Sequence, residues 1–267
     1  MGMTNAQGPV LVTAATGKTG RRVLARLTDL GIDARGITRS DGFDWDAPAR
    51  WPEFLTGVRA AYLAYAPDIA MPGAGAKVAA FAEAARAHGV ERLVMLSGRG
   101  EETALASEQA VRVVAPDTTI VRCSFFAQNF DEGALAGYIA AGTLTLPVID
   151  MPEPFVDVED VAEVAAKALA EPGHEGRLYE VTGPELLTFA QAAELLGAQA
   201  IAVPVDEWRA ELAAAGLPAD LIDLLAYLFT EVMDGRNRSV ADGVQQALGR
   251  PARRFEEFAA EMKKAAA

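Results

Sequence analysis

An apolar strand that runs directly into a glycine-containing turn is the feature that most constrains this fold. Val10 to Val12 is apolar and is followed by Thr13, and the turn that comes next is Ala14-Ala15-Thr16-Gly17-Lys18-Thr19-Gly20. An amphipathic helix comes next, and we expect it to begin at Gly20 and to end at Gly31. Glycine lets backbone N–H groups approach a pyrophosphate, and the positive end of the helix dipole points at the same place. The turn therefore predicts a site for a nucleotide phosphate.

Two other interpretations of this turn have to be weighed. Gly17-Lys18-Thr19 matches the end of a P-loop, GxxxxGK[ST], but Val12 stands where that motif requires its first glycine. The remaining spacing of Ala14, Gly17 and Gly20 is a GxxGxxG-like pattern with alanine in the first place, a variant found in short-chain dehydrogenases and their relatives. An ordinary strand, turn and helix corner is the alternative that the motif alone leaves open.

Composition excludes several classes of protein. The chain has 267 residues and a formal charge of −13, from 37 acidic and 24 basic residues. Such a charge argues against binding to nucleic acid or to an anionic membrane surface. The apolar stretches are of strand length, so we expect no membrane span, no secretion signal and a cytoplasmic location. A homodimer is compatible with this composition but is not required by it.

The scarcity of cysteine and histidine limits the chemistry. Cys123 is the one cysteine and is expected to be a small packed residue. His88 ends a helix pattern and His174 lies in a Pro-Gly turn, and we interpret both as solvated. The sequence therefore predicts no metal site and no Ser-His-Asp triad.

Strand and helix patterns alternate through the first two thirds of the chain, which indicates an α/β fold with a doubly wound parallel sheet of the Rossmann type. We expect strands at 10–13, 34–38, 60–65, 93–96, 118–122 and 178–182, and helices at 74–88, 102–114, 131–141 and around 161–169.

After Gly183-Pro184 the pattern becomes mostly helical, which predicts a small C-terminal cap that binds substrate. Thr188 and Gln191 form a capping-box signature. We therefore expect a dinucleotide-binding domain at 8–183, with excursions into the substrate domain around 125–155, and the cap at 184–267. Its expected helices span 189–196, 206–215, 218–233, 238–248 and 254–264.

The end of the second strand bears on the choice of cofactor. An acidic residue there binds the ribose 2′-hydroxyl of NAD, whereas a basic residue accommodates the 2′-phosphate of NADP. Arg39-Ser40 occupies that place, and Lys18 adds a second positive charge. We therefore expect NADP(H) in preference to NAD(H). Asp41 is the exception to consider, because a strand ending slightly later would bring its carboxylate to the ribose.

Taken together, the motifs resemble the NmrA-like family of atypical short-chain dehydrogenases/reductases. The resemblance extends from about residue 8 to about residue 258 and keeps the family's order. It is carried by the turn 16–20 and by Thr38-Arg39-Ser40, Tyr62-Leu63-Ala64-Tyr65-Ala66-Pro67, Leu96-Ser97, Val121-Arg122-Cys123-Ser124-Phe125-Phe126-Ala127-Gln128-Asn129-Phe130, Phe155-Val156-Asp157-Val158-Glu159-Asp160-Val161-Ala162 and Tyr179-Glu180-Val181-Thr182-Gly183-Pro184.

The resemblance implies a role for each of these segments. The pyrophosphate would be wrapped by Ala14, Thr16, Gly17, Lys18, Thr19 and Gly20. Arg39 and Ser40 would face the adenosine 2′ side, and Asp44 and Trp45 would border the adenine. The ribose and nicotinamide would be lined by Tyr65, Ala66, Pro67 and Ser97, and the substrate would be contacted by Tyr65, Phe125, Phe126 and Asn129.

The catalytic pair of ordinary short-chain dehydrogenases is missing. No tyrosine in the chain has a lysine four residues later, so chemistry that depends on a Tyr-x-x-x-Lys pair is not expected. Ser97 or Tyr65 could donate a proton weakly. Glu108 lies on the helix where the pair would stand, so it is a candidate proton relay, with a solvated helix carboxylate as the alternative.

Hydride transfer needs little from a protein beyond alignment of the nicotinamide with an electron-poor acceptor. We therefore expect an NAD(P)H-dependent reductase of a quinone or a polycyclic aromatic ketone, a flat aromatic substrate that could belong to a biosynthetic tailoring step. The alternative is a non-enzymatic NADP(H)-sensing regulator that binds a protein partner, since the family contains both kinds of protein.

Overall fold

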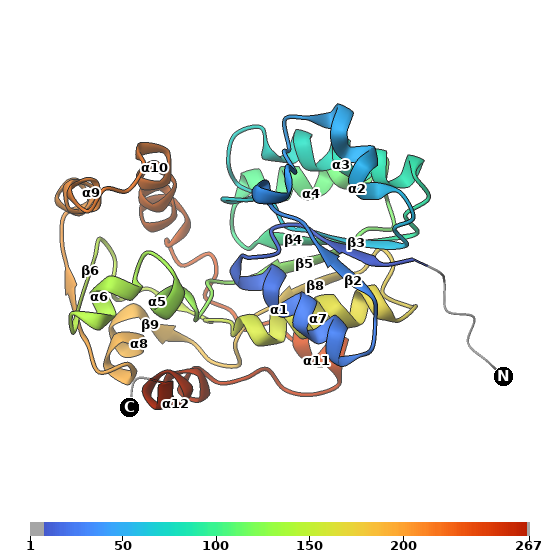
Figure 1. The fold of residues 1–267 in the computed structure, drawn as a ribbon. Coiled ribbons are helices and arrows are strands. Elements are labelled where there is room, and N and C mark those ends of the chain that lie inside the picture. The colour runs from blue at the N-terminus through green and yellow to red at the C-terminus, as the bar shows by residue number, and fades with distance from the viewer. Residues whose placement is uncertain (1–7, 266–267) are drawn as a thin grey trace. The chain divides into compact units, whose positions relative to one another are not determined.

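A six-stranded parallel sheet forms the centre of the first of two compact units (Figure 1). The computed structural model describes residues 8–265. The first unit comprises the chain up to Cys123 together with Val158–Val181 and Gly243–Arg250. The strands lie in the order β2-β1-β3-β4-β5-β8, and every neighbouring pair is parallel. They are β1 (Val10–Val12), β2 (Ala34–Gly36), β3 (Ala60–Leu63), β4 (Arg92–Gly98), β5 (Thr119–Cys123) and β8 (Leu178–Val181).

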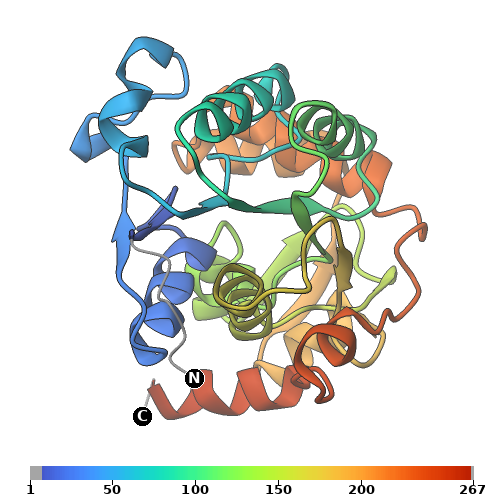
Figure 2. The same ribbon diagram turned by 90° about the vertical axis from the view of Figure 1, so that its right-hand side faces the viewer.

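Helices cover both faces of this sheet, as the predicted doubly wound fold requires. Figure 1 shows α2, α3 and α4 on one face and α1, α7 and α11 on the other, and the turned view in Figure 2 shows the same two layers. The first group is α2 (Trp51–Leu55), α3 (Ala74–Ala87) and α4 (Glu102–Val114), and the second is α1 (Lys18–Asp29), α7 (Val158–Ala170) and α11 (Gly243–Leu248). Short 3-10 turns span Arg39–Asp41 and Pro48–Arg50.

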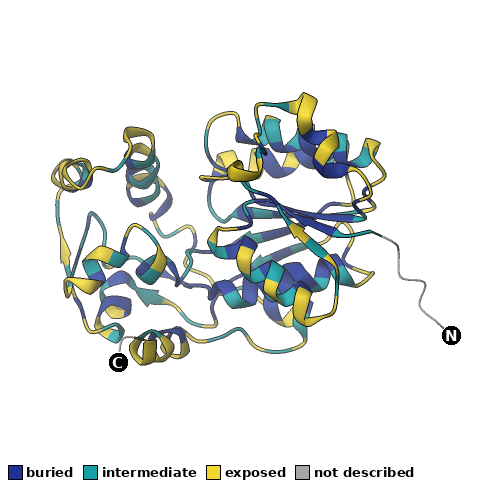
Figure 3. Cartoon of the chain, viewed as in Figure 1, coloured by how far each residue is buried: buried dark blue, intermediate teal, exposed yellow. Residues whose placement is uncertain are grey.

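The buried strands explain why the apolar runs in the sequence predicted this sheet. All residues of β1 and β3 are buried, as expected for central parallel strands that have helices on both faces. In Figure 3 the buried residues follow the strands and the inner faces of the helices. The strand order reverses at β1, between β2 and β3, so ligands are expected at the carboxyl ends of these strands.

The second unit comprises Ser124–Asp157, Thr182–Asp242 and the chain from Pro251 onward. It takes in the segment around 125–155 that we expected as an excursion, whereas Gly243–Arg250 belongs to the sheet unit. Its helices are α5 (Asn129–Glu132), α6 (Ala136–Ala140), α8 (Phe189–Leu195), α9 (Val205–Ala214), α10 (Ala219–Tyr227) and α12 (Phe255–Ala265), with a π-helical turn at Leu228–Val232.

Four short strands in the second unit were not predicted. β6 (Thr143–Leu146) pairs in parallel with β10 (Gln199–Ala202), and β7 (Pro152–Glu153) pairs antiparallel with β9 (Leu187–Thr188). The aromatic core of the unit contains Phe130, Phe155, Phe189, Phe229, Phe255 and Trp208. The predicted capping box is confirmed, because Thr188 Oγ1 accepts the N–H of Gln191 at 3.1 Å and the Gln191 side chain accepts the N–H of Thr188 at 2.9 Å.

Several predicted element boundaries were wrong. The first helix begins at Lys18 and not at Gly20, because Gly17 is the last residue with extended backbone angles (φ −74°, ψ 172°). The helix expected over 131–141 is interrupted at Gly133, which is also extended. The helix expected over 238–248 begins at Gly243.

His174 is also not the solvated residue that we expected. It is 8% exposed, and its Nδ1 lies 2.7 Å from the hydroxyl oxygen of Tyr179. Burial lowers the pKa of the His174 imidazole. His88 is exposed and Cys123 is buried, as predicted, and burial raises the pKa of the Cys123 thiol.

Within residues 8–265, no helix combines the length and the apolar character that spanning a bilayer requires.

Candidate active site

The glycine turn after β1 folds back tightly on itself. Gly17 donates its N–H to the carbonyl oxygen of Ala14 at 2.8 Å. A β-carbon on Gly20 would lie 2.8 Å from the carbonyl carbon of Ala14 and would overlap its oxygen, so only glycine fits there. Ala14 itself has a φ of +48°, the one positive φ of a non-glycine residue among residues 8–265. Alanine therefore occupies a backbone conformation that glycine adopts more readily.

The N-terminus of α1 suits an anion. Gly17 caps the helix without a side chain, and its first turn contains no acidic residue, so the dipole of the helix is not compensated there. Thr16 and Gly17 are exposed and Lys18 is half-buried, whereas Thr19 and Gly20 are buried. The exposed N-terminal part of the turn can thus face a phosphate, while Thr19 and Gly20 form its packed base.

Thr13, which the sequence analysis did not single out, ties this turn to the neighbouring strand. Its Oγ1 accepts the N–H of Ala64 at 2.8 Å and lies 3.1 Å from the carbonyl oxygen of Tyr62. The segment that begins at Tyr65 is therefore held next to the end of β1. A threonine that ends a buried strand is the sequence signal for this contact.

The two charged residues after β2, Arg39 and Asp41, differ in their surroundings. Asp41 Oδ2 accepts the backbone N–H of Thr38 at 2.9 Å and the Thr38 hydroxyl at 2.6 Å. Its carboxylate is therefore occupied locally. Arg39 is exposed, and its side chain has no hydrogen bond or ion pair within the described residues. Ser40 is exposed beside it, with its Oγ 2.7 Å from Thr38 Oγ1.

Two of the predicted segments meet through a pair of aromatic rings. The ring centroids of Trp45 and Tyr65 are 5.3 Å apart, and Trp45 also packs edge-on against Phe43 and Phe81. Asp44 contributes its backbone carbonyl to the indole N–H of Trp51 at 2.9 Å. The segments 44–45 and 65–67 thus lie together, with Ala66 and Pro67 exposed and joined by a cis peptide bond.

Ser97 and Glu108 have different surroundings. Ser97 is 3% exposed on β4, and its Oγ has no hydrogen-bond partner among the described residues. Glu108 is equally buried, so its interpretation as a solvated helix carboxylate is wrong. Arg122 holds both of its oxygens, with Nε 2.8 Å from Oε1 and Nη2 2.6 Å from Oε2, and Nη1 of Arg122 lies 2.9 Å from Oε1 of Glu180. Glu108 is therefore one half of a buried bidentate ion pair.

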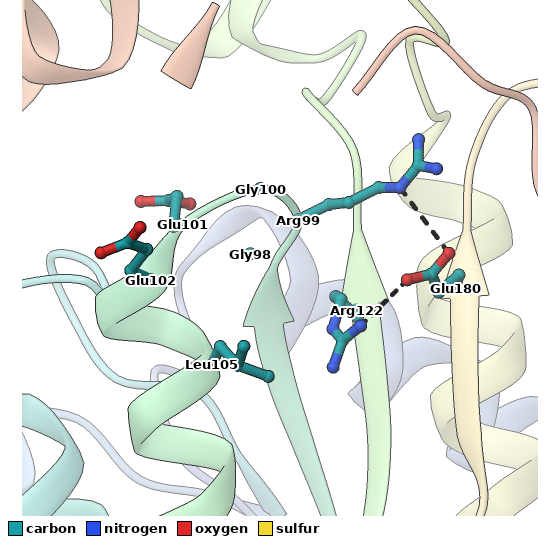
Figure 4. A pocket seen from close by; sticks show the side chains of 8 residues that line it. All are labelled: Gly98, Arg99, Gly100, Glu101, Glu102, Leu105, Arg122 and Glu180. Carbon is teal, nitrogen blue, oxygen red and sulfur yellow. Dashed lines mark hydrogen bonds and ion pairs between the residues drawn. The ribbon is translucent and has the colours of Figure 1, made fainter. Parts of the chain in front are cut away.

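A pocket of about 220 Å³ opens beside this ion pair, at the carboxyl ends of β4, β5 and β8 (Figure 4). Figure 4 shows Glu101 and Glu102 on one side and the arginines with Glu180 on the other. Its lining residues are Gly98, Arg99, Gly100, Glu101, Glu102, Leu105, Arg122 and Glu180.

Glu101 is the carboxyl group of this pocket whose pKa is raised. Burial, and then the charge of Asp68, raise the pKa of its carboxyl group to about 8. The sequence analysis missed both residues. Asp68 follows β3 and Glu101 follows the neighbouring β4, and acidic residues after two adjacent parallel strands are a signal that could have found them.

The predicted substrate residues other than Tyr65 lie in the second unit. Phe125 is half-buried, and its ring centroid lies 5.3 Å from that of Phe189 and 5.9 Å from that of Phe155. Phe126 forms an isolated parallel β-bridge with Val156. Asn129 is half-buried at the start of α5, and its backbone N–H is bonded to the carbonyl oxygen of Phe126 at 3.0 Å.

The sheet order, the glycine turn at the point where that order reverses, and Arg39 after β2 together define a dinucleotide-binding protein of the Rossmann type. No protein-family model matches the chain. Curated relatives, however, match almost all of it.

An uncharacterized oxidoreductase, YesF, of Bacillus subtilis is 31% identical over 283 residues, which cover 95% of this chain and 95% of the relative. The (4-alkanoyl-5-oxo-2,5-dihydrofuran-3-yl)methyl phosphate reductase of Streptomyces griseus is 35% identical, over 94% of this chain and 97% of its own. The NAD(P)H azoreductase of Xenophilus azovorans is 29% identical over similar shares of both chains, 94% and 96%.

Solved structures share the fold at lower identity. The triphenylmethane reductase of Citrobacter sp. in complex with NADP(H) superposes with a TM-score of 0.75 at 21% identity, over 93% of this chain and 98% of that one. The NADPH-dependent quinone oxidoreductase QOR2 of Escherichia coli gives 0.78 at 19%, over 95% and 99%. NmrA, a negative transcriptional regulator, gives 0.68 at 15%, over 97% and 98%.

The chain belongs to the NmrA-like family of atypical short-chain dehydrogenases/reductases. It is an NAD(P)H-dependent reductase. Its cofactor is a nicotinamide dinucleotide.

Proposed function

We propose that this protein oxidises NADPH and reduces a quinone or a polycyclic aromatic ketone. The choice of NADPH rests on which partners Arg39 and Asp41, the two charged residues after β2, have in the structure. Arg39 is exposed and without a partner in the described residues, whereas the carboxylate of Asp41 is bound by Thr38. A planar guanidinium can bind a 2′-phosphate with two hydrogen bonds. The carboxylate of Asp41 is already bound by Thr38 and does not compete for it.

The residues of the glycine turn fit the rest of the dinucleotide. Ala14, Thr16, Gly17 and Lys18 would contact the pyrophosphate, with Thr19 and Gly20 as the packed base of the turn. Arg39 and Ser40 would bind the 2′-phosphate. Asp44 and Trp45 would border the adenine, and Tyr65, Ala66, Pro67 and Ser97 would line the riboses and the nicotinamide.

Two features support a flat, electron-poor acceptor. No tyrosine has a lysine four residues on, so a mechanism that depends on that pair is not available. The relatives and structural neighbours include proteins named for azo compounds, quinones and triphenylmethane dyes. Phe125, Phe126 and Asn129, with Tyr65, remain the proposed contacts of the acceptor.

The bound cofactor would supply the hydride, and the protein would align the acceptor and provide a proton. Ser97 has a buried hydroxyl without a partner in the described part of the chain and so remains a proposed contact of the reacting groups. Glu108 is less suited to the proton relay that we considered, because Arg122 binds both of its carboxylate oxygens and leaves neither directed at a substrate.

A panel of acceptors tests this proposal. NADPH is incubated with the protein and with naphthoquinones, anthraquinones, azo dyes or polycyclic aromatic ketones, and the loss of NADPH absorbance is followed. We expect at least one quinone or aromatic ketone to accelerate that loss in proportion to the protein concentration. Tight binding of NADPH without acceleration by any of them would reject the proposed acceptors.

A further inference from the structure

Two carboxyl groups lie after neighbouring strands of the sheet, outside the residues assigned so far. Asp68 follows β3 and Glu101 follows β4, and the two strands pair in parallel with Leu63 opposite Met95. Both carboxyl groups are therefore at the carboxyl edge of the sheet, where parallel α/β folds bind their ligands. Asp68 is fixed locally, because its Oδ1 accepts the N–H of Ala70 at 2.8 Å.

The structure holds Glu101 in a defined place. A β-carbon on Gly98 would overlap Oε1 of Glu101 and would lie 3.2 Å from its Cδ, so the absence of a side chain at Gly98 makes room for the carboxyl group. Glu101 is only 8% exposed, and its Oε2 has no hydrogen-bond partner among the described residues. This is a buried, unsatisfied acid on the wall of a pocket, which is an arrangement expected at a functional site and not in a solvated loop.

The charged groups around Glu101 do not neutralise the negative charge of its ionised form. The pocket contains two cations, but Arg122 is bound by Glu108 and Glu180, and Nε of Arg99 lies 3.8 Å from Oε2 of Glu180. The charge that acts on Glu101 is that of Asp68, which is acidic as well. Desolvation and like charge both favour the protonated form of Glu101, and burial raises the pKa of Asp68 as well.

We propose that Glu101 is the proton donor of the reductase, from its place in the pocket at the carboxyl end of β4. In the reduction of a ketone, the carbonyl carbon gains a hydrogen and two electrons as the hydride, and the O–H bond of Glu101 breaks as a new O–H bond forms on the carbonyl oxygen. The bound cofactor would supply that hydride, the ketone becomes an alcohol, and solvent returns a proton to the Glu101 carboxylate through the pocket. A quinone would take up its proton in the same way. This inference rests on the proposed function. It assigns to Glu101 the proton donation that the tyrosine of a Tyr-x-x-x-Lys pair would otherwise perform.

The test uses Glu101→Gln and a matched control, Glu102→Gln, which changes the exposed neighbour in the same pocket. The first readout needs neither cofactor nor substrate. Infrared difference spectra of the carboxyl C=O stretch are recorded as the pH is raised from about 6 to about 10. We expect one carboxylic acid that ionises near pH 8 in the wild type. The band should be absent in Glu101→Gln, unchanged in Glu102→Gln and shifted to lower pH in Asp68→Asn.

The second readout is the pH profile of kcat with a ketone that the wild type reduces. We expect kcat to fall above about pH 8 in the wild type. Glu101→Gln should lower kcat by about 100-fold or more and remove that dependence, the usual scale for a lost general acid. NADPH affinity should be unchanged in both variants.

The outcomes separate this inference from the proposed function. Normal turnover by Glu101→Gln, or no protonated carboxyl group at neutral pH in the wild type, would overturn the role of Glu101 and leave the reductase intact. A wild type that binds NADPH but reduces no acceptor would overturn the proposed function, and the role of Glu101 with it.

Discussion

The carbonyl group of Ala14 occupies the space that a side chain on Gly20 would need. We expect Gly20→Ala to force the turn and α1 apart, to lower the free energy of unfolding by about 2 kcal/mol or more, and to weaken NADPH binding at least tenfold. Thermal unfolding and fluorescence titration with NADPH measure the two effects. Gly137→Ala is the control, because a β-carbon there meets no atom within 4 Å. If Gly20→Ala behaved like this control, the turn would not be the tight corner described above.

Arg39→Ala tests the assignment of the 2′-phosphate. The exposed guanidinium has no other partner in the described residues, so its removal should change little in the free protein. We expect NADPH binding to weaken by about 1–3 kcal/mol, the scale of a lost charged hydrogen bond, and NADH binding to stay the same. Isothermal titration with both dinucleotides gives the answer. Equal losses for both would reject the contact with the 2′-phosphate.

The buried ion pair between Arg122 and Glu108 gives a prediction on stability. Arg122→Met leaves Glu108 buried and without its cation, so we expect a loss of about 3–5 kcal/mol in the free energy of unfolding. Glu108→Gln should cost less, because it leaves no unpaired charge on the helix. Chemical denaturation measures both. The kcat of folded Glu108→Gln should stay within a few-fold of the wild type, and a collapse of kcat with an intact fold would restore Glu108 as the proton relay.

Glu101 predicts how stability depends on pH. Its pKa in the folded protein, about 8, lies above the value of 4.5 for an unperturbed carboxyl group. The folded state therefore binds the proton more tightly, and stability falls as the pH rises between these two values. We expect the free energy of unfolding of Glu101→Gln, relative to the wild type, to rise by about 4 kcal/mol between pH 5 and pH 9. A constant difference over that range would contradict the raised pKa.

Gly98→Ala tests the space that holds Glu101. The atom that a new β-carbon would meet is the end of a flexible side chain, so we expect the protein to fold and the Glu101 carboxyl group to move toward solvent. Its ionisation should then shift to lower pH in the infrared titration. An unchanged titration would show that Gly98 does not determine the position of the carboxyl group.

Much of the fold could be predicted from the sequence, because buried parallel strands are unbroken apolar runs and their helices keep an apolar stripe. The boundaries were less accurate where one residue decides them. The extended conformation of Gly17 moves the start of α1 to Lys18, and Gly133 interrupts a helix whose apolar spacing continues through it. The parallel pair β6 and β10 was missed because Thr143 to Leu146 and Gln199 to Ala202 are short, and their pairing is not local.

The candidate site was predictable only in part, because some of its groups depend on residues that lie far away in the sequence. The glycine turn and Arg39 belong to a local pattern whose chemistry can be read from neighbouring residues. The state of Glu101 depends on Gly98 and on Asp68, which is contributed by a different strand, so in the sequence it resembles an ordinary acidic residue before a helix. Glu108 was ambiguous for the same reason, because its partner Arg122 lies on β5.

The most direct test of NADPH-dependent reduction is the acceptor-dependent oxidation of NADPH and of NADH by the wild type, with the same quinone or aromatic ketone. We expect kcat/KM to be at least tenfold higher for NADPH, a difference of about 1.4 kcal/mol or more. Equal values for the two dinucleotides would contradict the role of Arg39, and no acceptor-dependent oxidation of either would contradict the proposed reaction itself.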